Sequence, residues 1–163
     1  MGYAARADLP IYIAGLSPKM LRLAGELADG VILWLCHPGY IREVVVPEVT
    51  KGRETVGKPL DGFDIVAAVP SAITDDPDAA REVMRKDLVP YFSLPFYRAM
   101  IERSGFEPDI EKSDAFIDTL AAIGTADEAN AVIDRYFDAG ATSPCVGPIA
   151  KTDFDTTLRA LSR

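Results

Sequence analysis

The chain has 163 residues, 48% of them apolar and 26% charged, which is enough for one domain with a sizeable core over residues 1–163. Its net charge of −8 argues against nucleic acid or an anionic membrane surface as a partner, because both favour a basic protein face. No 18-residue apolar run and no charged-then-apolar leader occurs, so we expect no membrane span, no signal peptide and a cytoplasmic location.

The first regular pattern is a strand, a helix and a second strand. Ile11–Ala14 is a short apolar run typical of a strand buried on both faces, and Val31–Leu35 is a second such run. Between them Ser17 suits an N-cap and Pro18 the first helical position. The following apolar residues share one helical face: Met20, Leu23, Ala24, Leu27 and Ala28. Gly30 fits the left-handed position that ends a helix, so the pattern predicts a right-handed βαβ unit.

The loop Gly15–Ser17 lies at the carboxyl end of the first strand and the amino end of this helix. Free N–H groups and the positive end of the helix dipole point outward there, and Lys19 adds a full positive charge. These features favour a cradle for a phosphate or carboxylate group. The plainer interpretation is that Ser17 only caps the helix and Lys19 is solvated, and the pattern alone does not choose between the two.

Further helices and strands follow in alternation. Tyr40–Val56 has a helix-like pattern that is interrupted at Pro47, which predicts a kinked helix or two short ones. Phe63–Val69 is predicted as the third strand, with Pro70–Thr74 continuing it outward. Asp76 and Pro77 then begin a helix that we expect to end before Pro90.

The stretch from residue 91 to 114 is less regular. Pro95 opens a predicted helix through Arg103, which Gly105 ends. Five aromatic residues gather in this stretch: Tyr91, Phe92, Phe96, Tyr97 and Phe106. A lid or subunit contact is one interpretation of them, and core packing is the one we favour.

The last third ends with a fourth strand and a helix. Phe116–Ile123 is predicted to be helical, and Thr125 with Glu128 has the spacing of a capping box. The helix that follows keeps an apolar face and stops at Gly140; the face comprises Ala129, Val132, Ile133, Tyr136 and Phe137. Ser143–Val146 is the fourth strand, in which Pro144 is unexpected for a central position. Thr152–Leu161 is the predicted closing helix.

Few side chains suggest chemistry. His37, the only histidine, follows the second strand, but a loop histidine without a role is the commoner case. Helix capping explains the acidic cluster Asp75, Asp76 and Asp78 better than a carboxylate site does. Cys36 and Cys145 are expected to be buried free thiols, and no Cys/His cluster indicates a metal site.

Three segments resemble one family. Residues 11–34 (IYIAGLSPKMLRLAGELADGVILW) are similar to the C-terminal half of the bacterial luciferase-like monooxygenases, and residues 63–82 and 123–141 follow in the same order. That family consists of (β/α)8 barrels that use FMN or coenzyme F420 for hydride chemistry. The resemblance implies an α/β fold, the parallel half of a TIM barrel with about four βα units. Met1 would then mark a truncated, split or engineered start, with Met1–Leu9 as a lead-in.

The resemblance also implies a cofactor site. In the family, the residues that match six positions of this chain lie beside the phosphate-bearing tail of the cofactor. These positions are Ala14, Gly15, Leu16, Ser17, Pro18 and Lys19. Trp34 would wall a flavin pocket, although core packing is the commoner role. The ring and most catalytic side chains would come from the missing N-terminal half, so no catalytic residue is assigned here. The resemblance implies coenzyme F420 or FMN as the cofactor, and on the same resemblance we favour coenzyme F420.

The predicted function is the C-terminal portion of a flavin- or F420-dependent oxidoreductase acting on a small molecule. The isolated chain is expected to be inactive. The alternative is a non-catalytic half-barrel that binds a phosphorylated ligand or a partner chain. A doubly wound binding domain is disfavoured because no GxGxxG turn occurs. Open sheet edges predict a homodimer or docking with a separate N-terminal half.

Overall fold

The computed structural model describes residues 8–162, so residues 1–7 of the predicted lead-in lie outside it. Its strands pair in parallel in the order β1–β2–β3–β5, and the short β4 extends the sheet at the far end of β3. The strand bounds are β1 (Tyr12–Ala14), β2 (Gly30–Leu33), β3 (Asp64–Ile73), β4 (Ala122–Gly124) and β5 (Ser143–Pro148). The predicted parallel α/β sheet is confirmed.

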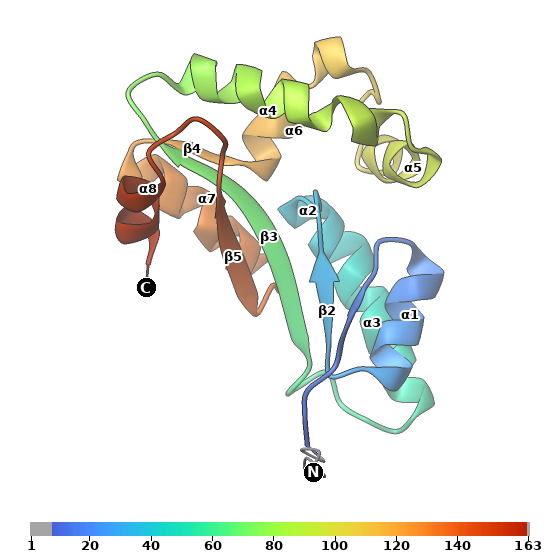
Figure 1. Ribbon diagram of the computed structural model, residues 1–163. Coiled ribbons are helices and arrows are strands. Elements are labelled where there is room, and N and C mark those ends of the chain that lie inside the picture. The colour runs from blue at the N-terminus through green and yellow to red at the C-terminus, as the bar shows by residue number, and fades with distance from the viewer. Residues whose placement is uncertain (1–7, 163) are drawn as a thin grey trace, which may run out of the picture.

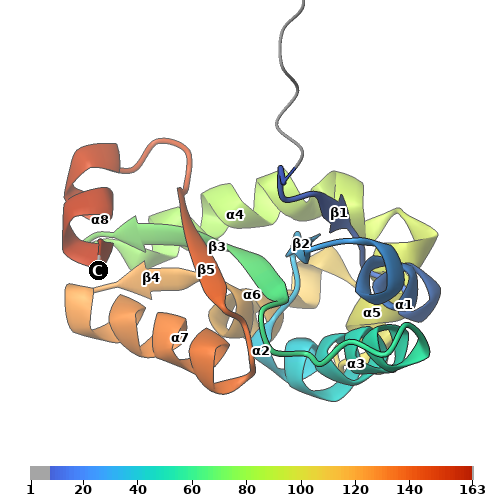
Figure 2. The same ribbon diagram turned by 90° about the horizontal axis from the view of Figure 1, so that it is seen from below.

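The helices lie on one face of this sheet and across one end of it. Their bounds are α1 (Pro18–Leu27), α2 (Pro38–Tyr40), α3 (Val46–Thr55), α4 (Pro77–Phe92), α5 (Pro95–Arg103), α6 (Asp114–Leu120), α7 (Ala126–Asp138) and α8 (Phe154–Leu161). A π-helical turn, Ile41–Val45, joins α2 to α3, and a 3-10 turn covers Ile110–Lys112. Figure 2 shows α1, α3 and α7 on the same side of the strands, whereas α4, α5 and α6 lie beyond the strand ends in Figure 1. Within residues 8–162 no helix is long and apolar enough to cross a membrane.

The two faces of the sheet differ in burial. Ile13, Val31 and Ile65 share one row of the strand register and face the helices, and Val31 and Ile65 are at most 1% exposed. The neighbouring rows contribute the open face of the sheet, which comprises Ala14, Ile32, Trp34, Val66 and Ala68. The prediction that the first two strands are buried on both faces is therefore wrong for this chain.

Helix α1 buries a face that only partly overlaps the predicted one, of which Ala24 and Ala28 are buried. It packs on α3 through Leu21, Ala24 and Gly25, whereas the predicted Leu27 is 71% exposed and Met20 and Leu23 are each 38% exposed. A Cβ on Gly25 would lie 2.4 Å from the carbonyl oxygen of Val49, so the glycine lets the two helices approach closely. Leu21 and the small residues Ala24 and Gly25 are buried, and Met20, Leu23 and Leu27 are left outside.

Gly30 was predicted to end α1 in a left-handed conformation, and this prediction is wrong. It begins β2, and a Cβ there would lie 2.3 Å from the Tyr12 ring. A side chain at this position would not fit beside the neighbouring strand, which explains the glycine. The helix ends at Leu27, and Ala28 has an extended conformation.

Local capping signals are confirmed. The Asp76 side chain accepts a hydrogen bond from the Ala79 N–H at 3.1 Å, and Thr125 forms the predicted capping box with Glu128. Gly105 and Gly140 adopt the left-handed φ values of 82° and 100° expected at helix ends.

Two helix bounds and one strand differ from the predictions. Helix α4 runs through Pro90 to Phe92, because a proline in the last turn disrupts little of the remaining helix. The predicted helix Phe116–Ile123 divides into α6 and β4. Pro144 is accommodated because β5 pairs only with β3 among the described strands, which makes β5 an edge strand.

Both cysteines are free, as predicted, but only one is buried. Cys36 is 1% exposed, whereas Cys145 lies on the exposed side of β5. Burial raises the pKa of the Cys36 thiol well above its ordinary value, so this thiol is unreactive at neutral pH.

Candidate functional site

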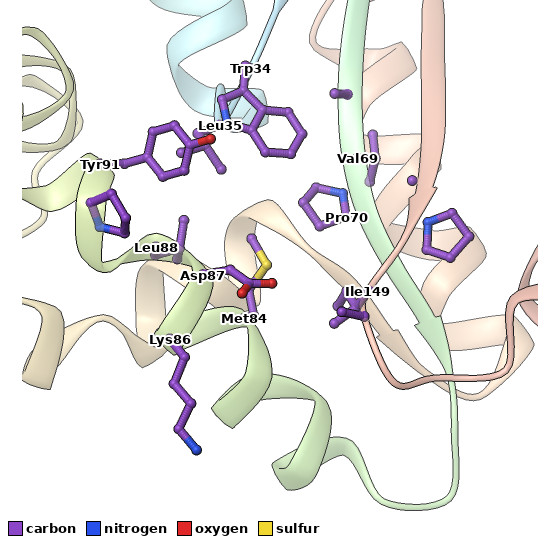
Figure 3. Close-up of a pocket in the computed structure, with 15 residues that line it drawn as sticks. Trp34, Leu35, Val69, Pro70, Met84, Lys86, Asp87, Leu88, Tyr91 and Ile149 are labelled. Carbon is purple, nitrogen blue, oxygen red and sulfur yellow. The ribbon is translucent and has the colours of Figure 1, made fainter.

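Two cavities lie at the carboxyl ends of the parallel strands, the position where such folds bind ligands. The first, which we call the α4 cavity, has a volume of about 620 Å³ and lies between α4, the middle of β3 and the ends of β2 and β5 (Figure 3). The second, the loop cavity, has a volume of about 410 Å³ and lies beside the β1–α1 connection. Trp34 lines both, so its side chain lies between them.

Four of the six predicted site residues line the loop cavity, namely Ala14, Gly15, Leu16 and Ser17. Pro18 occupies the first turn of α1, as predicted, and Lys19 is exposed in the same turn without an ion pair to any residue in the described range. Ile32, Trp34, Phe96 and Tyr97 complete the cavity wall. The structure thus brings the predicted loop together with an aromatic wall.

The start of α1 retains free hydrogen-bonding groups. Ser17 has the extended backbone of an N-cap, but its side chain forms no capping hydrogen bond. The hydroxyl and the N–H groups of the first turn are therefore available to a ligand, and the helix dipole makes an anion the favoured one.

Tyr40 fixes this loop from behind and was not predicted. Its hydroxyl donates a hydrogen bond to the Leu16 carbonyl oxygen at 3.0 Å, and the side chain is only 4% exposed. Burial is the main reason that the pKa of Tyr40 is raised to about 12, so the hydroxyl remains a donor at neutral pH. No local pattern links residues 24 positions apart, so this contact cannot be predicted from the sequence.

Gly15 has room for a side chain within the protein. A Cβ there would lie 3.4 Å from Val31 and 3.6 Å from Leu21, which are ordinary contact distances. The fold itself therefore does not require this glycine, in contrast to Gly30.

Trp34 belongs to a cavity wall, so the core-packing interpretation is wrong for it. Its side chain is 43% exposed, and its ring lies 6.2 Å from that of Tyr91, which in turn lies 5.1 Å from Tyr97. The predicted aromatic stretch divides: Phe92 is 5% exposed and packs in the core, whereas Phe96 is 53% exposed.

The turn after Trp34 is strained. Leu35 has a φ of 55°, the left-handed region that a leucine rarely adopts, and it is 2% exposed. Such a conformation costs on the order of 1–3 kcal/mol and occurs most often near binding sites. Here it ends β2 at the wall of the α4 cavity.

His37 has a structural role. It is 5% exposed, and its Nδ1 accepts a hydrogen bond from the Gly39 N–H at 3.2 Å, which caps α2. Burial lowers the pKa of His37 to about 4, so the imidazole is neutral at pH 7. It lines neither the α4 cavity nor the loop cavity.

The acidic cluster is also structural. Asp76 caps α4, which confirms the capping interpretation for that residue, and Asp78 instead forms an ion pair with Arg81 at 3.0 Å. Among residues 8–162 no group of three or more His, Cys, Asp or Glu side chains is arranged to hold a metal ion.

Comparison with known sequences identifies relatives for most of the chain. The model of a family described as luciferase-like monooxygenase matches residues 3–143. A 5,10-methylenetetrahydromethanopterin reductase of Methanopyrus kandleri is 33% identical over 128 residues, covering 75% of this chain and 36% of the relative. The corresponding reductase of Archaeoglobus fulgidus is 31% identical over 178 residues, covering 96% and 53%.

Solved structures share the fold. The coenzyme F420-dependent tetrahydromethanopterin reductase of Methanopyrus kandleri has a TM-score of 0.72 at 24% identity, over 88% of this chain and 46% of that one. The FMN complex of a Baeyer–Villiger monooxygenase component of Pseudomonas putida has a TM-score of 0.65 at 18% identity, over 90% and 44%. The chain therefore spans about half the length of the proteins that it matches.

Proposed function

Because the chain belongs to the luciferase-like monooxygenase family, we propose that it is the tail-binding portion of a coenzyme F420- or FMN-dependent oxidoreductase. The observation that carries this proposal is the loop cavity, where predicted phosphate-contacting residues meet the free amino end of α1. The relatives with solved structures use coenzyme F420 or contain FMN, in keeping with either cofactor.

The residues of the loop would each have a separate part in binding. Gly15 permits close approach of the ligand to the backbone, and the first N–H groups of α1 donate to phosphate oxygens. Ser17 adds a hydroxyl, Lys19 adds a positive charge, and Tyr40 holds the loop through the Leu16 carbonyl oxygen. Trp34 excludes water from one side.

When bound, the cofactor would supply the hydride chemistry, and the protein would supply binding and orientation. Among the described residues that line the two cavities, we assign no acid–base pair to catalysis. We therefore propose that the single domain of residues 1–163 is inactive alone and that oxidation or reduction of a small molecule requires the ring-binding half.

A titration tests the phosphate assignment. FMN and riboflavin differ only in the phosphate, so the ratio of their dissociation constants isolates its contribution. We expect FMN to bind at least tenfold more tightly, and Lys19→Ala to reduce this preference severalfold. Gly15→Ala should weaken FMN binding while the unfolding free energy changes by less than about 1 kcal/mol, because the new methyl group has space in the protein.

The matched control is Lys58→Ala, which removes an exposed lysine in a distant loop. Equal affinity for FMN and riboflavin in the parent chain, or equal effects of Lys19→Ala and Lys58→Ala, would contradict the proposal. A parallel titration with coenzyme F420 decides which cofactor the chain prefers.

The second candidate is a non-catalytic half-barrel that binds a phosphorylated ligand or a partner chain. The observation in its favour is the open face of the sheet, where Ile32 is 45% and Trp34 43% exposed. Either a second copy or a separate N-terminal half would cover this face. Cofactor turnover by the assembled protein separates the two candidates, because only the first requires it.

A further inference from the structure

A third cavity, which we call the basic cavity, has a volume of about 490 Å³ and is lined by parts of the π-helical turn, of α7 and of the end of α5. Each of these three elements contributes one arginine: Arg42, Arg103 and Arg135. Among residues 8–162, none lines both this cavity and the α4 cavity or the loop cavity. We propose that the basic cavity is a second anion site, separate from the cofactor loop, that binds a small molecule through its phosphate group.

A buried donor in this cavity has no acceptor. His37 lines the cavity and is 5% exposed, and its Nδ1 accepts the hydrogen bond from Gly39, which leaves the proton of the neutral ring on Nε2. This buried Nε2 has no hydrogen-bond partner among residues 8–162. A buried N–H group without an acceptor is unfavourable, and an anion in the cavity would supply one. The histidine thus distinguishes the basic cavity from an ordinary group of surface arginines.

The arginines of the basic cavity are also available to a ligand. Arg42 and Arg135 form neither an ion pair nor a hydrogen bond with residues 8–162, although Glu43 and Asp138 line the same cavity. By contrast, the arginines of α4 and α8 are paired with carboxylates. Positive charges around one cavity repel one another, and an anion with more than one negative charge relieves that repulsion.

The geometry of the cavity favours a phosphate group over a carboxylate. Guanidinium groups from three directions can each bind two oxygens, which suits a tetrahedral dianion. The volume exceeds that of a phosphate group alone, and the hydroxyls of Ser104 and Thr119 remain for the rest of the ligand. Arg42 lies in the π-helical turn, a conformation that occurs frequently at functional sites.

His37 provides a local measurement of binding. It is the only histidine of the chain, so an NMR spectrum of its imidazole nitrogens contains the signals of one ring, which lines this cavity. Inorganic phosphate and glycerol phosphate are added at constant ionic strength, with acetate as the monoanion for comparison. We expect saturable shifts of the Nε2 signal, with dissociation constants for both phosphate ligands at least tenfold lower than for acetate. Tighter binding of glycerol phosphate would identify an ester as the ligand, and tighter binding of inorganic phosphate would identify the free ion.

Arg42→Gln and Arg135→Gln should each raise the dissociation constant for phosphate at least fivefold. The matched control is Arg159→Gln, which removes the same charge at an exposed position of α8 and should leave the constant unchanged. The thermal midpoint of each variant checks its folding.

Three results would overturn the inference: no saturable shift with either phosphate ligand, equal affinity for phosphate and acetate, or equal effects of Arg135→Gln and Arg159→Gln. Lys19→Ala should alter the FMN-to-riboflavin ratio and leave the His37 shift unchanged. Failure of this second site and failure of the cofactor loop are therefore distinguishable.

Discussion

At the scale of single residues, His37 shows how burial decides the role of a polar side chain. Its Nδ1 accepts the capping hydrogen bond, so the proton of the neutral ring resides on Nε2, which is buried and has no hydrogen-bond partner among residues 8–162. Protonation would place a charge among the rings of Phe106 and Phe116 and would break the cap. The capping bond of His37 was not predicted from the sequence, because the two residues it joins form no recognised capping motif.

We predict that His37 makes the folded chain less stable in weak acid. The folded pKa is about 4, whereas an unfolded histidine titrates near 6.5. Between these values the unfolded chain binds a proton that the folded chain does not, so the unfolding free energy decreases as pH falls from about 6.5 to about 4. By pH 5 the loss attributable to His37 should be about 1–2 kcal/mol.

Urea unfolding at pH 7.5 and pH 5 measures this loss. His37→Asn retains a side chain that caps helices well but removes the titrating group, so its unfolding free energy should change less between the two pH values. An equal loss in the parent chain and in His37→Asn would show that other groups cause the acid sensitivity.

At the scale of secondary structure, the α1–α3 pair depends on two glycines and one carboxylate. A Cβ on Gly52 would lie 2.1 Å from the Arg22 carbonyl oxygen, so this residue, like Gly25, permits the close approach of the helices. Glu48 of α3 is 9% exposed, accepts hydrogen bonds from Arg22 of α1 and from Lys51 at 2.7 Å, and links the two helices.

Glu48 should stabilise the fold at neutral pH. Its hydrogen bonds with Arg22 and Lys51 lower its pKa to about 2, so the contribution is present above its ordinary pKa of 4.5 and is lost as pH falls towards 2. We expect Glu48→Gln to reduce the unfolding free energy at pH 7 by about 1–2 kcal/mol, a value discounted because Arg22 is half exposed.

Glu54→Gln, at an exposed position of the same helix, should change the unfolding free energy by less than about 0.5 kcal/mol. Denaturant titrations at pH 7 and near pH 2.5 give the comparison. A Glu48→Gln effect as small as that of the control, or one that persists near pH 2.5, would argue that the interhelical pair contributes nothing.

The secondary structure also shows which features the sequence can predict. Caps and stops at Asp76, Thr125 and Gly140 were predicted correctly because their signals lie within one turn of chain. The buried face of α1 was predicted only in part, with Leu21 missed, because it depends on contact with α3, which is not adjacent in the sequence. The loop Gly15–Ser17 was predicted from its local motif to precede α1, and it does, whereas Tyr40 was missed because only tertiary packing brings its hydroxyl to the Leu16 carbonyl oxygen.

At the scale of the whole molecule, the sheet has helices over one face and an uncovered opposite face (Figure 2). Strand β1 pairs only with β2 in the described structure, so its outer edge is open, and Ile11 beside it is 62% exposed. Leu27 adds a further exposed apolar side chain on α1. Open parallel edges and apolar surface of this kind favour association.

We therefore predict that the purified chain self-associates, with a solution mass of at least twice its 17.6 kDa. Two copies that each contribute β1, β2, β3 and β5 would pair β1 of each with β5 of the other, and so close an eight-stranded parallel barrel with a two-fold axis along its centre. Ile32→Glu, on the open face, should shift the mass towards that of the monomer, because a buried unpaired carboxylate opposes closure.

Light scattering after size exclusion gives the mass directly, and Val56→Glu supplies a control at an apolar residue, 43% exposed, at the end of α3. If a separate N-terminal half is the true partner, its addition should convert the associated chain into a one-to-one complex, and Ile32→Glu should weaken that complex too. A compact monomer with a single sharp melting transition would contradict both forms of the prediction, because it would mean that the open face of the sheet is stable in water.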